Sequence, residues 1–227
     1  MKYDAILPPA DYKKPDVVGL ISSRAIVFWD FDGVIKDSVN VKTEAFERLF
    51  SVYGPDIAAR VKAHHEANGG VSRYEKIPLY LTWVGLPCDQ DNVDQFCSRF
   101  SDAVLDAVVD SPWVPGVQEY LLDHCELQYF VLVTATPQQE IESILDKLGI
   151  AHCFRQVHGA PTDKKDAIAG VLRVQRIDVA DVLMIGDSET DRSAADANQV
   201  PFLLRRTRIN RSLQSSYCGP QFEDLIR

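Results

Sequence analysis

The stretch Ala25-Ile-Val-Phe-Trp-Asp-Phe-Asp-Gly-Val-Ile-Lys-Asp-Ser38 decides the fold. Its first five residues are all apolar, which is typical of a strand buried on both faces of a parallel sheet. Asp30 and Asp32 follow at once, and Gly33 lets the backbone turn sharply behind them. Because ligands bind at the carboxyl ends of strands in open α/β sheets, both carboxylates are expected at a functional edge. An Asx-rich turn is the alternative for this stretch taken alone.

Four further apolar runs alternate with helical segments, which favours a parallel sheet covered by helices. The expected strands are 129–133, 155–158, 182–185 and 202–204, and the expected helices are 138–148, 165–174 and 190–198. The segment from Val39 to Asp110 shows helical periodicity instead, and two prolines and a glycine close it. We therefore predict a Rossmann-like, three-layer α/β core formed by residues 1–38 and 111–227. An all-helical cap domain, residues 39–110, is inserted into it.

Composition excludes several classes of protein. The formal net charge of −9 over 227 residues makes a nucleic acid or an anionic membrane an unfavourable main partner. No apolar run approaches the ~18 residues of a membrane span, and Met1 to Lys14 lacks the apolar core of a signal peptide. The five cysteines are scattered, which argues against a disulfide framework or a zinc site and favours a cytoplasmic location.

A second acidic cluster, Gly186-Asp-Ser-Glu-Thr-Asp191, follows the fourth expected strand. Alone it could be a helix N-cap with acidic residues in the first turn. Combined with Asp30 and Asp32, however, Asp187 and Asp191 form a carboxylate cage at one sheet edge. Such a cage suits a hard, oxygen-preferring divalent cation, and Mg²⁺ leaves room for waters and a phosphate.

Two more strand ends carry groups that could bind a phosphate. Thr134 and Ala135 follow the second expected strand and precede a helix, where a hydroxyl and free amides can cradle an anion. The alternative is a simple helix N-cap. The loop after the third expected strand carries Lys164 and Lys165, either of which could neutralise a phosphate, although a single lysine is more often a solvated charge.

The sequence resembles the haloacid dehalogenase-like hydrolase superfamily in four elements that occur in the same order. They are DxDGxxxDS, a hydroxyl after an apolar run, a lysine loop and GDSxxD. The resemblance runs from about Arg24 to Leu204, and the inserted helices resemble the C1 cap of the β-phosphoglucomutase and phosphoglycolate phosphatase branch. It implies a Mg²⁺-dependent phosphatase that hydrolyses a small phosphorylated metabolite, such as a sugar or polyol phosphate, through an aspartyl-phosphate. A sugar-phosphate mutase and a non-catalytic regulatory binding module are the alternatives.

The resemblance also implies roles for the acidic residues. Asp30 would be the nucleophile, and Asp32 would protonate the leaving oxygen and then activate water. Asp30, the backbone carbonyl of Asp32, and Asp187 would hold Mg²⁺. Asp191 would support the site and the lysine. The second aspartate at Asp32 favours phosphoryl transfer over dehalogenation, since an alkoxide leaving group needs an acid.

The same resemblance assigns the phosphate-binding groups. Thr134, Ala135 and Gly33 would contact the phosphoryl group, and a lysine would neutralise its charge. We favour Lys164 over Lys165 because Lys164-Lys-Asp-Ala-Ile resembles the family's K-x-[DE]-A-[LI] run.

Within the insert, Gly70-Val-Ser-Arg73 resembles the cap loop of the mutase branch, where the arginine grips a distal phosphate. Arg73 and Lys76 are therefore expected to bind substrate, and a plain interhelical loop with solvated charges is the alternative. His64 and His65 are expected on a helix surface. The position of the mutase branch's gating histidine holds Lys42, which favours a phosphatase over a mutase.

Overall fold

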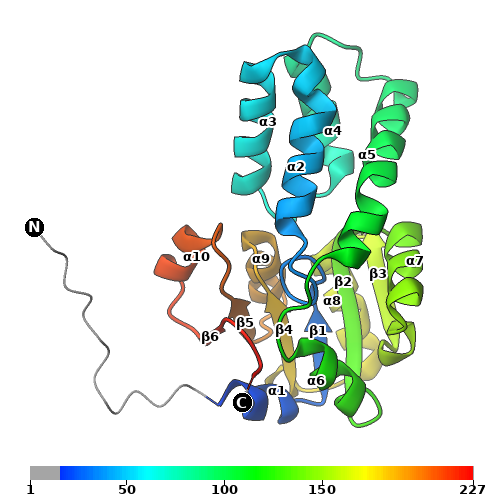
Figure 1. Cartoon of the computed structure of the whole chain (residues 1–227). Coiled ribbons are helices and arrows are strands. Elements are labelled where there is room, and N and C mark those ends of the chain that lie inside the picture. Colours follow the sequence, from blue (N-terminus) through cyan, green and yellow to red (C-terminus); the bar gives the residue numbers. More distant parts are fainter. Residues whose placement is uncertain (1–15, 227) are drawn as a thin grey trace, which may run out of the picture.

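The computed structural model describes residues 16–226, so the sequence interpretation of Met1 to Lys14 falls outside the described residues. Its centre is one parallel sheet with the strand order β3-β2-β1-β4-β5-β6 (Figure 1). The strands are β1 Ile26–Trp29, β2 Tyr129–Pro137, β3 Gln156–Ala160, β4 Val182–Gly186, β5 Phe202–Arg205 and β6 Gln221–Phe222. The predicted parallel α/β sheet is confirmed.

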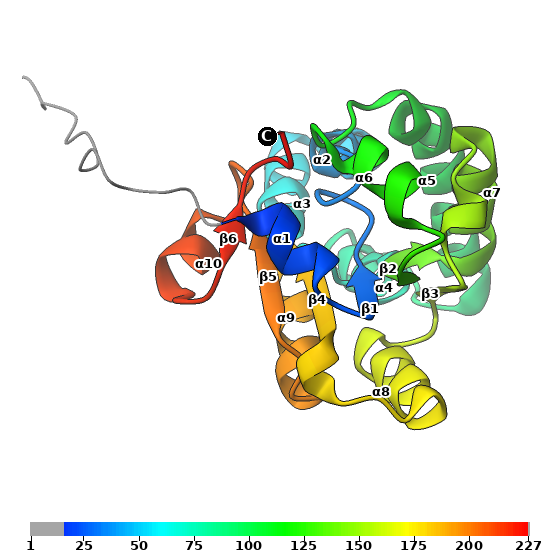
Figure 2. The same cartoon turned by 90° about the horizontal axis from the view of Figure 1, so that it is seen from below.

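Helices cover both faces of the sheet, as the view from below shows (Figure 2). On one face lie α1 Val17–Ser22, α6 Val117–His124 and α7 Gln138–Leu148. On the other lie α8 Lys164–Gln175, α9 Glu189–Ala197 and α10 Arg211–Ser216. Short 3₁₀ turns span Ser51–Tyr53, Ala151–Cys153 and Val179–Asp181. Alternate residues of β1 pack into separate clusters on the two faces, which explains why the run Ala25 to Trp29 is apolar throughout.

Four helices stand above the carboxyl ends of the strands in Figure 1. They are α2 Val39–Phe50, α3 Pro55–Ala67, α4 Arg73–Trp83 and α5 Gln90–Asp110. Aromatic side chains hold them together: the rings of Phe46 and Phe100 are tilted against each other with centroids 4.0 Å apart, and Tyr80 packs edge-on against both Phe46 and Phe50. These helices form the cap, and they lie between β1 and α6 in the chain.

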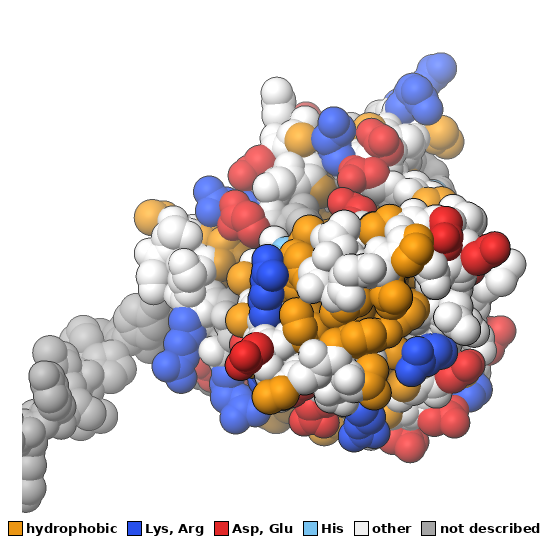
Figure 3. Space-filling view, turned by 90° about the horizontal axis from the view of Figure 1, so that it is seen from above, with side chains coloured by type: hydrophobic (Ala, Val, Ile, Leu, Met, Phe, Trp, Pro, Cys, Tyr) orange, Lys and Arg blue, Asp and Glu red, His pale blue; other side chains and the backbone are white. Residues whose placement is uncertain are grey.

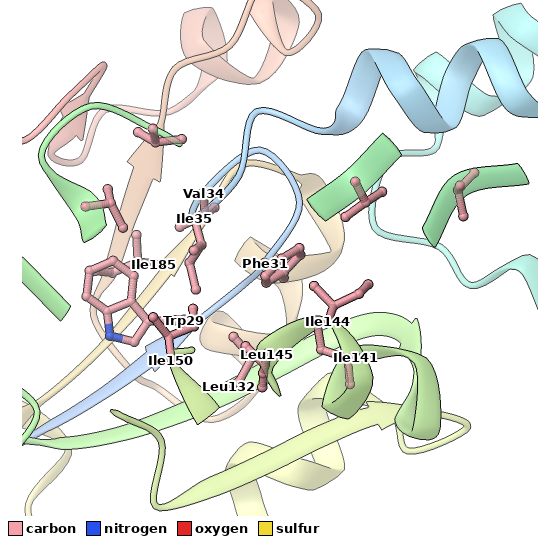
Figure 4. Close-up of a cluster of buried hydrophobic side chains, with 14 of the residues drawn as sticks. Trp29, Phe31, Val34, Ile35, Leu132, Ile141, Ile144, Leu145, Ile150 and Ile185 are labelled. Atoms are coloured by element: carbon pink, nitrogen blue, oxygen red, sulfur yellow. The ribbon is translucent and has the colours of Figure 1, made fainter. Parts of the chain in front are cut away.

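The turn after β1 is anchored by a side chain between the two aspartates. Phe31 is completely buried and points into the cluster that contains Ile141 and Ile144 of α7 (Figure 4). The backbone amides of Ile35 and Lys36 both donate to the carbonyl of Phe31. Burial of this ring fixes the loop, so the flanking aspartates are held in a defined position.

Two element boundaries beside the cavity, the end of β2 and the start of α8, differ from the sequence expectations. Strand β2 continues to Pro137, beyond the expected end at Val133, because Pro137 still pairs with Ala160 of β3 after a register shift. Helix α8 begins at Lys164, one residue earlier than expected, since the Asp163 carboxylate accepts a hydrogen bond from the amide of Lys165 and caps the helix. The short elements α1, α6, α10 and β6 were not expected.

Seen from above, the cap carries a central group of hydrophobic side chains ringed by charged ones (Figure 3). Exposed apolar side chains of the cap include Val52, Tyr53 and Leu79. Within residues 16–226, none of the helices combines the length and apolar character needed to cross a bilayer. All five cysteines are free thiols.

Candidate active site

A cavity of about 1310 Å³ lies between the cap and the carboxyl ends of the strands. Predicted site residues in its wall are Asp30, Asp32, Arg73, Lys76, Thr134, Ala135, Lys164 and Asp187. The structure therefore brings together residues from the four strand-end loops and from the cap. Gly33 and Asp191 do not line the cavity, but each adjoins a residue that does: Gly33 lies against Asp187, and Asp191 contacts Lys164.

Lys164 occupies the centre of the polar floor. Its ammonium donates to Asp30 Oδ1 at 2.9 Å and to Asp191 Oδ1 at 2.6 Å, and all three side chains are buried. Burial, then the charge of Asp191, raises the pKa of Asp30 to about 7. The neighbouring Lys165 is exposed, and its backbone amide donates to the Asp163 carboxylate that caps the helix.

Asp191 is held from two sides. Besides the contact with Lys164, its Oδ2 accepts from the amide of Ser188 at 3.0 Å and from the hydroxyl of Ser188 at 2.5 Å. The amide of Asp191 in turn donates to the Ser188 hydroxyl, which completes a capping box at the start of α9. Both carboxylate oxygens are thus engaged, so Asp191 positions Lys164.

Three carboxylates at the strand ends could hold a divalent cation. Oxygen atoms of Asp30, Asp187 and Asp191 lie within 4.8 Å of one another. Burial and the charges of Asp30 and Asp191 raise the pKa of Asp187 well above its usual range. Gly33 has φ +78°, and a Cβ there would come 2.3 Å from Asp187 Oδ2. Any larger residue at position 33 would displace the Asp187 carboxylate.

Asp32 faces a separate group of donors. Ser38 Oγ donates to Asp32 Oδ1 at 2.6 Å, and Thr136 Oγ1 donates to Oδ2 at 3.1 Å. Lys42 forms an ion pair with Oδ2 and also donates to Thr136 at 2.8 Å. Burial alone would raise the pKa of Asp32, but Lys42 and the hydroxyl donors outweigh it and lower the pKa. The carboxylate of Asp32 is therefore charged in the free site.

Sequence reasoning missed several of these contacts. Thr136 was overlooked, although it lies two residues after Thr134, and alternate residues of a strand share a face. The sequence interpretation treated Lys42 only as the residue that replaces the gating histidine of the mutase branch. In the structure, Lys42 forms an ion pair with Asp32. Ser38 belongs to the quoted motif, but its hydroxyl was given no role.

Arg73 has a different partner from the distal phosphate that the sequence suggested. Its guanidinium binds Glu140 of α7 through two hydrogen bonds of 2.6 and 2.9 Å. Ser101 of α5 accepts from Arg73 at 2.5 Å and donates to Glu140 at 2.7 Å. This buried cluster joins the cap to the core.

Lys76 has a buried imidazole as its partner. Its ammonium lies 3.1 Å from His65 Nδ1, and both side chains are buried. The expectation that His65 sits on a helix surface is wrong, because α3 turns this side chain inward against Phe46, with ring centroids 4.9 Å apart. Burial, then the charge of Lys76, lowers the pKa of His65 to about 2, so the imidazole is neutral.

The cap loop closes directly onto the core. Gly70 has φ +80°, and a Cβ at this position would come 2.1 Å from Thr190 Oγ1 and 2.5 Å from Ser188 Oγ. The two hydroxyls are themselves 2.8 Å apart. Glycine therefore permits the closest approach between the cap and the loop that carries Asp187.

A second group of metal-binding side-chain types lies near the opposite ends of the strands. The ligand atoms of Cys125, His152 and Cys153 are within 4.8 Å of one another. Burial raises the pKa of the Cys153 thiol to about 12, so this sulfur remains protonated. The group is remote along the strands from the cavity.

Residues 27–204 match the sequence model of the family described as haloacid dehalogenase-like hydrolase. Phosphoglycolate phosphatase 1 of Pseudomonas aeruginosa is 25% identical over 179 residues, which cover 76% of this chain and 65% of the relative. Phosphoglycolate phosphatase of Pseudomonas putida is 26% identical with the same coverage. The chain thus spans just under two thirds of the length of these relatives.

Solved structures show the same fold. A protein described as a predicted phosphoglycolate phosphatase from Haemophilus somnus has a TM-score of 0.67 at 16% identity, covering 89% of this chain and 95% of that one. A mutant of CbbY from Rhodobacter sphaeroides, in complex with xylulose-(1,5)-bisphosphate, has a TM-score of 0.70 at 12% identity with the same coverage. At these identities the likeness concerns the fold alone. Because the family match spans most of its length, the chain belongs to the haloacid dehalogenase-like hydrolase family.

Proposed function

We propose that this protein is a Mg²⁺-dependent phosphatase that hydrolyses a small phosphorylated metabolite through an aspartyl-phosphate on Asp30. The observation that carries the proposal is the buried contact of 2.9 Å between Lys164 and Asp30 on the floor of the cavity. The names of the curated relatives support a phosphatase with a small substrate. The free thiols suit a reducing compartment, so we propose that the enzyme works in the cytoplasm.

In the first step, Asp30 attacks the phosphorus atom and the bond from phosphorus to the leaving oxygen breaks. Lys164 orients the nucleophile and offsets the negative charge of the phosphoryl oxygens. The hydroxyl of Thr134 and the amide of Ala135, both at the cavity, would bind those oxygens. The leaving oxygen takes a proton from the Lys42 ammonium, which is paired with the charged Asp32, so Lys42 is left neutral.

In the second step, water attacks the phosphorus atom of the aspartyl-phosphate. Asp32 accepts the proton of this water and passes it to Lys42, and the bond from Asp30 to phosphorus breaks. Phosphate is released, and the Asp30 carboxylate and the Lys42 ammonium are restored. The charged state of Asp32, maintained by Ser38, Lys42 and Thr136, suits it to act as this base.

Asp30, Asp187 and the backbone carbonyl of Asp32 would hold Mg²⁺, because the nearby oxygen atoms form a hard donor set and the crowded carboxylates need a cation. When bound, the ion would supply positive charge to the phosphoryl oxygens. Asp191 is excluded as a ligand in this proposal, since Lys164 and Ser188 engage both of its oxygens.

The test is release of p-nitrophenol from p-nitrophenyl phosphate with and without Mg²⁺. We expect activity that EDTA abolishes and added Mg²⁺ restores. The Asp187→Asn variant should need a much higher Mg²⁺ concentration, whereas Asp37→Asn, which changes a half-exposed aspartate between β1 and α2, should behave as wild type. Full activity in EDTA would refute the metal requirement. No hydrolysis under any condition, with the protein folded, would refute the phosphatase.

A further inference from the structure

Among the described residues, Lys76 stands out as a buried cation without a salt-bridge partner. Its side chain is 2% exposed, it lies on α4, and it lines the cavity. Within residues 16–226, no carboxylate forms a salt bridge with it, and its hydrogen-bond partner is His65. The ring of Phe46 lies 5.9 Å from the ammonium and adds only a weak attraction.

The other cations deep in the cavity wall are all paired with acids. The pairs are Lys42 with Asp32, Lys164 with Asp30 and Asp191, and Arg73 with Glu140. Lys76 therefore stands apart as the one deep cation of the described cavity wall that still has charge to offer a ligand.

His65 holds Lys76 in place without neutralising it. The imidazole is neutral, so its Nδ1 accepts one hydrogen bond from the ammonium and compensates no charge. An ammonium has three donors, and two remain for a ligand in the cavity.

An ammonium buried in this way is unfavourable in the empty cavity. Burial, then the nearby Lys42, lowers the pKa of Lys76 to about 7. A buried charge is retained at low cost only when an opposite charge and hydrogen bonds compensate it. An anion that enters beside Lys76 would supply both, because it restores the charged ammonium and accepts its protons.

The position of Lys76 tells which part of the substrate carries this anion. The phosphoryl group must reach Asp30 and Lys164 at the strand ends, whereas Lys76 and His65 belong to the cap helices. The second anion must then be on the leaving group. One lysine beside a neutral imidazole matches a carboxylate, which has a single charge. A second phosphate would need another free cation, and Arg73 is already paired with Glu140.

We propose that Lys76, held by His65, binds a carboxylate on the leaving group, so that the substrate class is small phosphorylated hydroxy acids and not neutral sugar or polyol phosphates. The inference rests on the proposed phosphatase function. It assigns the specificity to one residue of the cap and gives Arg73 a role in joining cap to core.

The experiment compares three substrates with the wild-type enzyme and Lys76→Met, which removes the charge and keeps the chain length. The substrates are 2-phosphoglycolate, the neutral analogue 2-hydroxyethyl phosphate and 2-phosphoethyl phosphate, which carries a second phosphate. We expect the wild type to prefer 2-phosphoglycolate in kcat/KM. Lys76→Met should lower kcat/KM for 2-phosphoglycolate by about 10- to 100-fold, the range for loss of a charged hydrogen bond, and much less for the neutral analogue.

Lys62→Met is the matched control, because Lys62 also lies in the cap but pairs with Glu47 at the surface. It should leave all three values unchanged. Equal losses with every substrate in Lys76→Met, or a wild-type preference for the neutral analogue or the bisphosphate, would overturn the inference. If Lys76→Met fails to fold, the order of kcat/KM for the three substrates with the wild-type enzyme still tests the inference. Hydrolysis of p-nitrophenyl phosphate without a preference for the carboxylate would refute this inference alone, whereas loss of all hydrolysis would refute the phosphatase itself.

Discussion

The two halves of the cavity carry opposite charges and come from different parts of the chain. The acidic half, which consists of Asp30, Asp187 and Asp191 around Lys164, is built by loops at the strand ends. The basic half, which consists of Lys42 and Lys76 with His65, is built by three cap helices. Asp32 lies where the halves meet, since it belongs to a core loop but pairs with Lys42. We infer that the acidic half performs phosphoryl transfer and that the basic half binds the leaving group and so selects the substrate.

We expect the largest loss of activity from a substitution of Lys164, at the centre of the acidic half. Lys164→Ala should reduce kcat by about 10²–10³, the usual cost of removing one charge-stabilising donor. The reduction should be similar for all substrates, because Lys164 contacts the nucleophile and not the leaving group. Steady-state kinetics with Lys165→Ala as the matched control, which should be nearly normal, checks this. A severe loss in Lys165→Ala would move the role to the neighbouring residue.

A smaller and substrate-dependent effect is expected where the halves meet. Lys42→Met removes the cation paired with Asp32 and should reduce kcat by about 10² for alkyl phosphates, since their leaving oxygen needs a proton. p-Nitrophenyl phosphate should lose far less, because nitrophenolate departs without protonation. Comparing kcat for the two substrate types is the measurement. An equal loss for both would show that Lys42 takes no part in proton transfer.

The smallest effect concerns closure of the basic half onto the acidic half. Gly70→Ala should lower kcat/KM by on the order of tenfold, because its Cβ would push the cap loop away from Ser188 and Thr190 and misplace the cap groups. Gly85→Ala is a close control, since Gly85 also lies in the cap with φ +72° but faces open space. Each variant should lose about 1–2 kcal/mol of stability from backbone strain, measured by thermal unfolding. If both variants keep full activity, the contact of Gly70 does not govern closure.

The acidic half could be predicted from the sequence because its residues follow the strands that position them. Asp30 comes directly after a run of buried apolar residues, and Asp187 directly follows β4. Parallel strands bring their carboxyl ends to one edge, so the sequence spacing already implies the meeting of these side chains. The sheet, the flanking helices and the helical insert were predictable for the same reason, since each has a clear hydrophobic period.

The basic half could not be predicted because its contacts depend on how the cap helices pack. Lys76 and His65 are eleven residues apart on different helices, and their contact follows from the packing of aromatic rings around Phe46. The pair of Arg73 and Glu140 joins residues 67 positions apart across the boundary between cap and core. Local periodicity says that such residues lie on helices, but not which of them meet.

The central claim is that Asp30 becomes phosphorylated, and trapping the intermediate tests it most directly. The wild-type enzyme with Mg²⁺ is mixed with a ³²P-labelled phosphate monoester and quenched in acid within milliseconds. We predict a label on the protein that hydroxylamine removes, that maps to the peptide containing Asp30 and that is absent from Asp30→Asn. Rapid phosphate release without a protein-bound label, or a label on another residue that persists in Asp30→Asn, would contradict the account.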